Sequence, residues 1–222
     1  MREILKCYAN SDEVEARLKM LKPDLENYSI YGENMDVTIV FEEISQDDYD
    51  DITEMLDDII YNDRDVSLAR TLVSFLRKNG LTIAVAESCT GGLISSAIVD
   101  IEGASDVFYE GMVTYSNLSK MTRLNVKSQT LEEFGAVSQE TVLEMANGVL
   151  TESVDFGISI SGIAGPEGGS LEKPVGLVYI GIVGQNSSEV IKNVFEGDRQ
   201  KIRECAKNAA LFYTLQHIKK YY

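Results

Sequence analysis

The sequence is poor in the residues that bind metals or form disulfides. It has only three cysteines, Cys7, Cys89 and Cys205, which form no C-x-x-C pair, and His217 is its only histidine. An odd number of widely spaced cysteines argues against a disulfide framework and fits a reducing compartment. Because zinc sites take their ligands mainly from clusters of histidine and cysteine, the sequence predicts no metal site.

Basic charge and long hydrophobic runs are also scarce. The 20 lysines and arginines are outnumbered by 36 aspartates and glutamates, which leaves a net charge of −16. Nucleic acid is a poor partner for such a surface, since binding relies on lysine and arginine to neutralise phosphates. The sequence has no run of about 18 apolar residues to span a membrane, and its first ten residues lack the apolar core of a signal peptide. We therefore expect a cytoplasmic protein with no nucleic-acid or membrane partner.

Proline is rare as well, with three residues, and the 44% hydrophobic and 25% charged content is typical of a globular protein. A length of 222 residues allows one good-sized domain and a small one.

Residues 1–63 predict a small α+β domain with strands at 4–8, 28–31 and 36–42, helices at 12–21 and 47–60, and a turn at 61–63. We expect the many acidic residues between 42 and 58 to form a solvated helix face.

The elements become longer and more apolar in residues 64–222. Helices are predicted at 67–78, 92–99, 139–151 and 198–219, and strands at 82–86, 107–115, 156–161, 175–183 and 190–195. The first of these helices ends at Asn79-Gly80, a common stop signal. Strands that alternate with helices imply a sheet covered on both faces, so we predict a three-layer α/β/α domain.

A candidate site lies at residues 86–92, AESCTGG, where an apolar strand turns into a helix. Ser88 is a candidate nucleophile in this turn. The backbone N–H groups at such a helix start, at Thr90, Gly91 and Gly92, point outward and can hold an oxyanion or a phosphate. The alternative is structural, in which Ser88 and Thr90 only cap the helix.

A nucleophilic serine needs a base, and the sequence leaves lysine for that role. We expect His217 to be a surface residue of the last helix, far in sequence from every glycine-rich loop. Lys120 follows the strand at 107–115 in the first turn of a predicted helix, where the helix dipole and partial burial both disfavour the ammonium form. The alternative for Lys120 is an exposed helix lysine.

Lys173 is a second lysine to consider, because it follows a glycine-rich loop. Ser170 and Lys173 have the S-x-x-K spacing of penicillin-recognising enzymes, but Pro174 disfavours helical geometry at Lys173. We therefore expect a loop lysine that contacts ligand or solvent.

Two further segments are candidates for ligand binding. The glycine-rich loop at 162–169 fits either a close approach of backbone to ligand or a tight turn. Arg199 and Arg203 stand one turn apart at the start of the last helix. This spacing predicts two guanidinium groups that bind one phosphate through paired hydrogen bonds. The alternative is the charged first turn of an amphipathic helix.

Six segments, AESCTGGL, GMVTYSN, GAVS, SGIAGPEGGS, KPVGLVYIG and GDR, occur in this order and together resemble the CinA C-terminal, or nicotinamide-mononucleotide deamidase, family. The resemblance runs from about residue 81 to the last helix. It implies hydrolysis of the carboxamide of nicotinamide mononucleotide to nicotinic acid mononucleotide and ammonia, in pyridine nucleotide salvage and without a cofactor. Family analogy also suggests a homodimer.

Residues 1–63 resemble the small KH-like middle domain of full-length CinA proteins, whose larger N-terminal domain has no counterpart in this sequence. No G-x-x-G stands between two predicted helices there, so the resemblance implies topology and not RNA binding. Activities of that larger domain are therefore not expected.

The resemblance also implies roles for particular residues. Ser88 matches the nucleophile, Lys120 the base and Tyr115 a tyrosine that assists the pair, while Ser161 falls where relatives carry Thr or Ser. Substrate and oxyanion contacts are expected at Thr90, Gly91, Gly92, Asn117, Gly162, Gly165, Lys173, Arg199 and Arg203.

Two other interpretations remain open. One is a catalytically idle nucleotide-binding or interaction module derived from a competence/damage-inducible CinA protein. The other is a cysteine amidase that uses Cys89, because thiolates at helix N-termini are activated.

Overall fold

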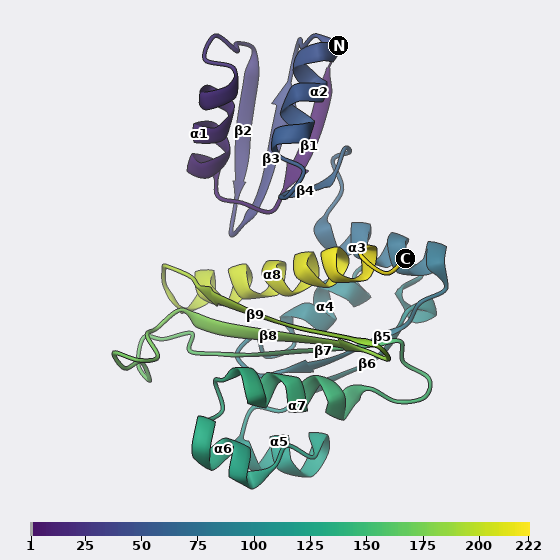
Figure 1. The fold of residues 1–222 in the computed structure, drawn as a ribbon, viewed down its shortest axis with the longest axis vertical. Helices are drawn as coiled ribbons and strands as arrows, with labels where there is room; N and C mark the ends of the chain where they lie inside the picture. The colour runs from purple at the N-terminus through teal and green to yellow at the C-terminus, as the bar shows by residue number, and fades with distance from the viewer. Residues whose placement is uncertain (1) are drawn as a thin grey trace. The chain divides into compact units, whose positions relative to one another are not determined.

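The structure, a computed structural model, describes residues 2–222 and divides into two compact units (Figure 1). The first unit ends at Thr71 and the second begins at Leu72. Within the described residues, no helix is both long enough and apolar enough to cross a lipid bilayer.

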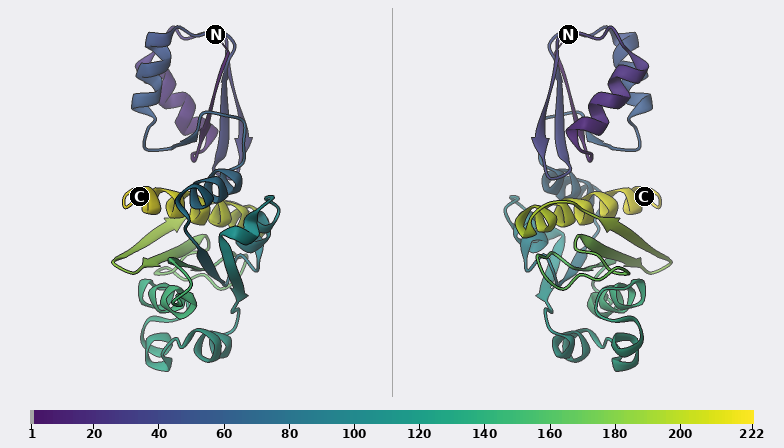
Figure 2. Two further views of the ribbon diagram at one scale, coloured as in Figure 1. Left: turned by 90° about the vertical axis from the view of Figure 1, so that its right-hand side faces the viewer. Right: turned by 90° about the vertical axis from the view of Figure 1, so that its left-hand side faces the viewer.

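The first unit is a four-stranded antiparallel sheet with two helices on one face (Figure 2). Its elements are β1 Glu3–Cys7, α1 Ser11–Leu21, β2 Tyr28–Glu33, β3 Asp36–Phe41, α2 Gln46–Met55 and β4 Ile60–Asn62, and the strand order is β2-β3-β1-β4. Alternate residues of β1 and β3, such as Leu5 and Ile39, face Leu18 of α1 and Ile52 of α2 in one core. Most acidic residues between 42 and 58 are exposed.

The end of this unit differs from the sequence prediction. The helix predicted at 47–60 ends at Met55, and the predicted turn at 61–63 is largely strand β4, which pairs with β1. The Tyr8 N–H donates to Ile59 O at 2.8 Å and so starts this pairing. A three-residue strand stabilised by a partner about 55 positions away leaves no periodic signal in the sequence.

The second unit has the predicted layered α/β fold. Helix α3, Leu68–Asn79, begins in the last residues of the first unit and continues into the second. The other elements of the second unit are β5 Ile83–Glu87, α4 Leu93–Val99, η1 Ala104–Asp106, β6 Phe108–Val113, α5 Asn117–Leu124, α6 Ser128–Phe134, α7 Gln139–Val149, β7 Phe156–Gly162, β8 Leu177–Gly184, β9 Ser187–Val194 and α8 Arg199–Lys219. The sheet order is β6-β5-β7-β8-β9, in which β6, β5 and β7 are parallel and β8 and β9 are antiparallel. Helices α3, α4 and α8 cover one face and α5, α6 and α7 the other (Figure 1). The α/β fold class is confirmed.

Helix α7 packs unusually close to the sheet. A Cβ atom at Gly157 of β7 would overlap Ala146 O, and one at Gly181 of β8 would lie 2.8 Å from Val142 O. Ser159 Oγ donates to Val142 O at 2.5 Å. The two glycines therefore let the helix backbone rest on the strands, and this contact fixes the loop that precedes α7.

Candidate active site

The candidate nucleophile and base meet at the carboxyl ends of two parallel strands. Ser88 follows β5, and its N–H donates to Ile160 O of β7 at 3.1 Å. Lys120 lies in α5, which follows β6, and the Thr114 N–H donates to Glu87 O at 2.8 Å. Parallel strands end at the same edge of a sheet, so two residues 32 positions apart come together. Lys120 Nζ lies 2.9 Å from Ser88 Oγ.

The Lys120 side chain is buried, with 1% of its surface exposed. Burial disfavours the charged form and lowers the pKa of Lys120 to about 8. Nζ also lies 2.8 Å from Thr114 O and 3.3 Å from Tyr115 O. In the neutral amine, two N–H bonds can go to these carbonyls, which leaves the lone pair to accept the Ser88 hydroxyl proton. The geometry is that of an activated nucleophile.

Glu87 organises the turn that carries Ser88. Its carboxylate is fully buried and accepts from the N–H groups of Gly92, Ile94 and Ser95 at 2.8, 3.2 and 2.8 Å. It also accepts from Ser95 Oγ at 2.7 Å. A carboxylate at a helix N-terminus satisfies the unpaired donors and complements the dipole.

This cap corrects part of the expected oxyanion site. The Gly92 N–H is taken by Glu87 and the Gly91 N–H donates to Ser88 O at 3.2 Å, so neither points outward. Gly91 and Gly92 have positive φ angles of 63° and 101°, respectively, which lets the chain fold back onto the Glu87 carboxylate. Sequence reasoning missed Glu87 because its neighbours AESCTGG suggested an open turn.

A cavity of about 180 Å³ opens in front of Ser88. It is lined by Ser88, Cys89, Tyr115, Lys120, Ala136, Val137, Ser161, Gly162, Ala164 and Arg199. Six of these residues were predicted at the site, whereas the apolar wall of Ala136 and Val137 was not. That wall lies between α6 and α7, in the GAVS segment. Ser161 Oγ donates to Ala136 O at 2.7 Å and so holds the wall in place.

Tyr115 and Arg199 form the polar mouth of this cavity. Both side chains are exposed, and Arg199 Nη2 donates to Tyr115 Oη at 3.2 Å. Arg199 Nη1 donates to Gly165 O at 2.8 Å. The backbone carbonyl of Tyr115 contacts the Lys120 amine, while the Tyr115 hydroxyl contacts Arg199 and not Lys120.

Of the nine predicted ligand contacts, Gly162 and Arg199 line the cavity, and seven do not: Thr90, Gly91, Gly92, Asn117, Gly165, Lys173 and Arg203. Arg203 donates from Nε to Cys89 O at 3.1 Å and from Nη2 to Thr90 O at 2.6 Å, which ties α8 to the Ser88 turn. Lys173 Nζ donates to the carbonyls of Phe134 and Val137 at 2.6 and 2.8 Å. Asn117 is the exposed first residue of α5. Two of these long side chains therefore hold protein loops together.

The Cys89 thiol lines the cavity but is poorly suited to attack. Burial raises its pKa to about 12, so the side chain is a thiol at neutral pH. This observation weighs against the cysteine amidase interpretation.

The prediction that His217 lies at the surface is wrong. Only 1% of the residue is exposed, and its ring packs nearly perpendicular to Phe156 at a centroid distance of 6.1 Å. Its nitrogens contact Glu189 Oε2 at 2.7 Å and Ser187 Oγ at 3.0 Å. Helix α8 is buried on several sides by the sheet and by α4, which its mixed polar sequence does not indicate.

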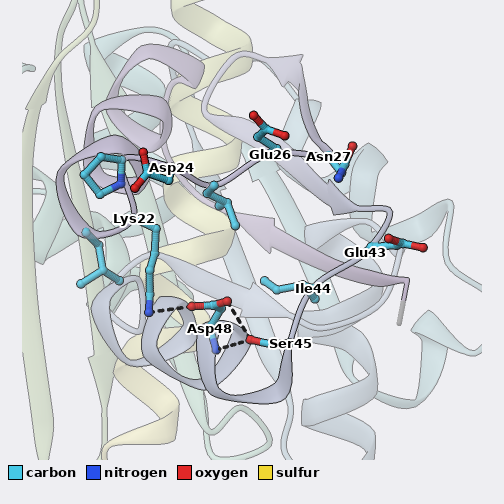
Figure 3. Close-up of a pocket in the computed structure, with 11 residues that line it drawn as sticks. Lys22, Asp24, Glu26, Asn27, Glu43, Ile44, Ser45 and Asp48 are labelled. Carbon is cyan, nitrogen blue, oxygen red and sulfur yellow. Dashed lines mark hydrogen bonds and ion pairs between the residues drawn. The ribbon is translucent and has the colours of Figure 1, made fainter.

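A larger cavity, about 390 Å³, lies in the first unit between the loop that follows α1 and the start of α2, lined by residues 21–27, 43–45 and 48 (Figure 3). Its only lysine, Lys22, forms ion pairs with Asp48 and Asp51 at 2.7 and 2.6 Å. Hydrogen bonds to these carboxylates raise the pKa of Lys22, so it remains an ammonium. Unlike Lys120, this lysine is therefore not a candidate base.

Comparisons with known proteins agree with this fold and motif order. Residues 65–218 match the family model of the CinA C-terminal domain. A CinA-like protein of Kosmotoga olearia is 49% identical over 170 residues, which are 76% of this chain and 40% of that protein.

Two solved structures are also similar. The competence/damage inducible protein CihA of Agrobacterium tumefaciens is 42% identical with a TM-score of 0.62, and the match covers 67% of this chain and 93% of that chain. A CinA-superfamily protein of Escherichia coli is 34% identical with a TM-score of 0.65, covering 68% and 88%.

A layered α/β unit with these motifs and these relatives defines the family. The chain belongs to the CinA C-terminal domain family. It spans about 40% of the length of the Kosmotoga relative.

Proposed function

We propose that the chain is an amidohydrolase that converts nicotinamide mononucleotide to nicotinic acid mononucleotide and ammonia. The observation that carries this proposal is the 2.9 Å contact between Ser88 Oγ and a buried amine whose pKa is lowered to about 8. Such an amine is partly neutral near physiological pH and can act as a general base. The choice of substrate rests on the family resemblance.

In the first half-reaction, Lys120 Nζ takes the Ser88 hydroxyl proton as Oγ attacks the carboxamide carbon. The resulting oxyanion needs donors other than Gly91 and Gly92, and the N–H groups of Thr90, Gly162, Ala164 and Gly165 are the candidates. The Ile163 N–H donates to Leu177 O. Collapse breaks the C–N bond. The Lys120 ammonium supplies the proton with which ammonia leaves, and a nicotinoyl ester of Ser88 remains.

In the second half-reaction, water attacks this ester and gives its proton to the now neutral Lys120. Cleavage of the ester bond returns that proton to Ser88 Oγ and releases nicotinic acid mononucleotide.

The size of the cavity supports a binding mode in which the nicotinamide ring lies inside it and the phosphate of the nucleotide lies outside. A volume of 180 Å³ is below the roughly 300 Å³ at which pockets for drug-sized ligands begin, so it fits a single aromatic ring. The rest of a nucleotide would then extend past the mouth, where Arg199 offers a planar guanidinium to the phosphate.

The test is ammonia release from nicotinamide mononucleotide, nicotinamide riboside and NAD, measured with the full chain. We expect the mononucleotide to have the highest kcat/KM. Release from none of the three would favour the idle nucleotide-binding or interaction module instead.

A further inference from the structure

A second hydroxyl, imidazole and carboxylate meet where the β8–β9 hairpin contacts the end of α8. Ser187 Oγ lies 3.0 Å from His217 Nε2, and His217 Nδ1 lies 2.7 Å from Glu189 Oε2. Ser187 and Glu189 are two residues apart on β9, so their side chains share one face of the strand. The proposed amidase mechanism uses none of these residues.

The surroundings fix the roles of the two imidazole nitrogens. Burial by itself would raise the pKa of Glu189, but hydrogen bonds from His217 and Lys220 outweigh it and hold that pKa below its ordinary value. An ionised carboxylate only accepts hydrogen bonds, so Nδ1 carries the proton of the neutral ring. Nε2 is then free to accept the proton of the Ser187 hydroxyl. This is the relation of nucleophile, base and orienting acid found in serine hydrolases.

This cluster lies at the opposite edge of the sheet from Ser88. In the sheet register, Gly184 pairs with both Phe156 and Ser187, and Phe156 is the first residue of β7. Ser88, in contrast, contacts Ile160 near the far end of β7. At about 3.3 Å per residue, the two ends of this strand are roughly 20 Å apart.

Ser187 lines a cavity of about 280 Å³ with aromatic walls. The cavity is formed by Asp155, Phe156, Gln185, Asn186, Ser187, Tyr221 and Tyr222. The rings of Phe156 and Tyr222 meet edge to face at 6.1 Å. His217, which packs on Phe156 and on Tyr221, is buried behind this wall. A small aromatic or short-chain group fits such a volume.

Donors for a developing oxyanion are close in sequence. Gln185 and Asn186 are the two central residues of the hairpin turn between Gly184 and Ser187. The N–H groups at the centre of a two-residue turn take no part in the strand ladder. They are the candidate donors beside the Ser187 hydroxyl.

We propose that Ser187 is the nucleophile of a second site, which takes the acyl group of small carboxylic esters. Ser187 Oγ bonds to the ester carbonyl carbon while His217 Nε2 accepts the hydroxyl proton. The ester C–O bond then breaks, and the alcohol leaves with that proton. Water attacks the acyl-serine, His217 again accepts a proton, and breaking the Ser187 ester bond returns it to Oγ as the free carboxylic acid departs.

The test uses the full chain in a Ser88→Ala background, so that the first site cannot contribute. The probes are p-nitrophenyl acetate turnover and fluorophosphonate labelling read by peptide mass spectrometry. We expect Ser88→Ala to hydrolyse the ester and to be labelled at Ser187. Adding Ser187→Ala should lower ester turnover at least tenfold and abolish the label.

Two further variants separate catalysis from folding. Ser188→Ala changes the neighbouring exposed serine and should leave turnover unchanged. Glu189→Gln removes the orienting charge from a half-exposed position and should lower turnover at least tenfold while the melting temperature stays close to that of the parent.

Equal turnover with and without Ser187, or no label on Ser187, would overturn the proposal. Ammonia release by the Ser187→Ala single variant should remain at the wild-type rate, so the two sites are tested separately.

Discussion

Two lysines of this chain show how surroundings decide what a side chain can do. Lys22 contacts two carboxylates, which raise its pKa and keep it charged. Lys120 is buried among backbone carbonyls and the Ser88 hydroxyl, and burial lowers its pKa to about 8. Only the second lysine can both accept and return a proton near neutral pH.

The lowered pKa of Lys120 predicts the pH dependence of ammonia release. The ammonium form cannot accept the Ser88 proton, so kcat/KM should rise with pH, pass its midpoint near pH 8 and level off above it. Measurement at low substrate from pH 6 to 9.5 gives this midpoint. Lys120→Arg stays charged throughout this range and should be at least about a hundredfold slower at every pH. A flat profile for the wild type would contradict the role of Lys120 as base.

The two arginines at the start of α8 should differ in their effects. Arg199 lies at the cavity mouth, so Arg199→Ala should lower kcat/KM for nicotinamide mononucleotide about ten- to a hundredfold more than for the riboside, which lacks the phosphate. Arg203 is the matched control, because it holds the carbonyls of Cys89 and Thr90. Arg203→Ala should lower the rate for both substrates alike. The reverse pattern would place the phosphate at Arg203.

At the scale of elements, the contact between α7 and the sheet supports the cavity wall. Gly157→Ala would push a methyl group into Ala146 O, so we expect a loss of about 1–3 kcal/mol in the free energy of unfolding. Urea unfolding measures this loss, and Ser188→Ala on the exposed side of β9 is the control. Stability equal to wild type would mean that α7 is free to shift.

Elements with a strong local signal were predicted well. The strands of the second unit and helices α3, α4, α7 and α8 follow from apolar periodicity and from stops such as Asn79-Gly80. Elements defined by distant partners were not predicted. Strand β4 depends on β1, and α6 is seven residues long with no apolar stripe that distinguishes it from a loop.

The residues of the candidate site also divide into those with a local sequence signal and those without one. Ser88, Lys120, Tyr115 and Ser161 could be named because strand ends and the family motifs mark them. The apolar wall and the buried state of His217 depend on packing between segments far apart in the sequence. A single sequence carries no local signal for such contacts.

At the scale of the molecule, the second unit contains the whole proposed amidase site. The solved Agrobacterium relative supports its independence, because the matched part makes up 93% of that chain. Removing residues 1–63 should therefore leave a folded protein with ammonia release within about threefold of the full chain. A folded but inactive truncation, judged by circular dichroism, would mean that the first unit completes the site.

The most direct test of the central claim is ammonia release from nicotinamide mononucleotide by Ser88→Ala and Cys89→Ala beside the wild type. The two side chains are neighbours that line one cavity, and only the serine contacts Lys120 Nζ. The Ser88–Lys120 account predicts that Ser88→Ala falls at least about a hundredfold with an unchanged melting temperature, while Cys89→Ala keeps most of its activity. An active Ser88→Ala together with an inactive Cys89→Ala would contradict it.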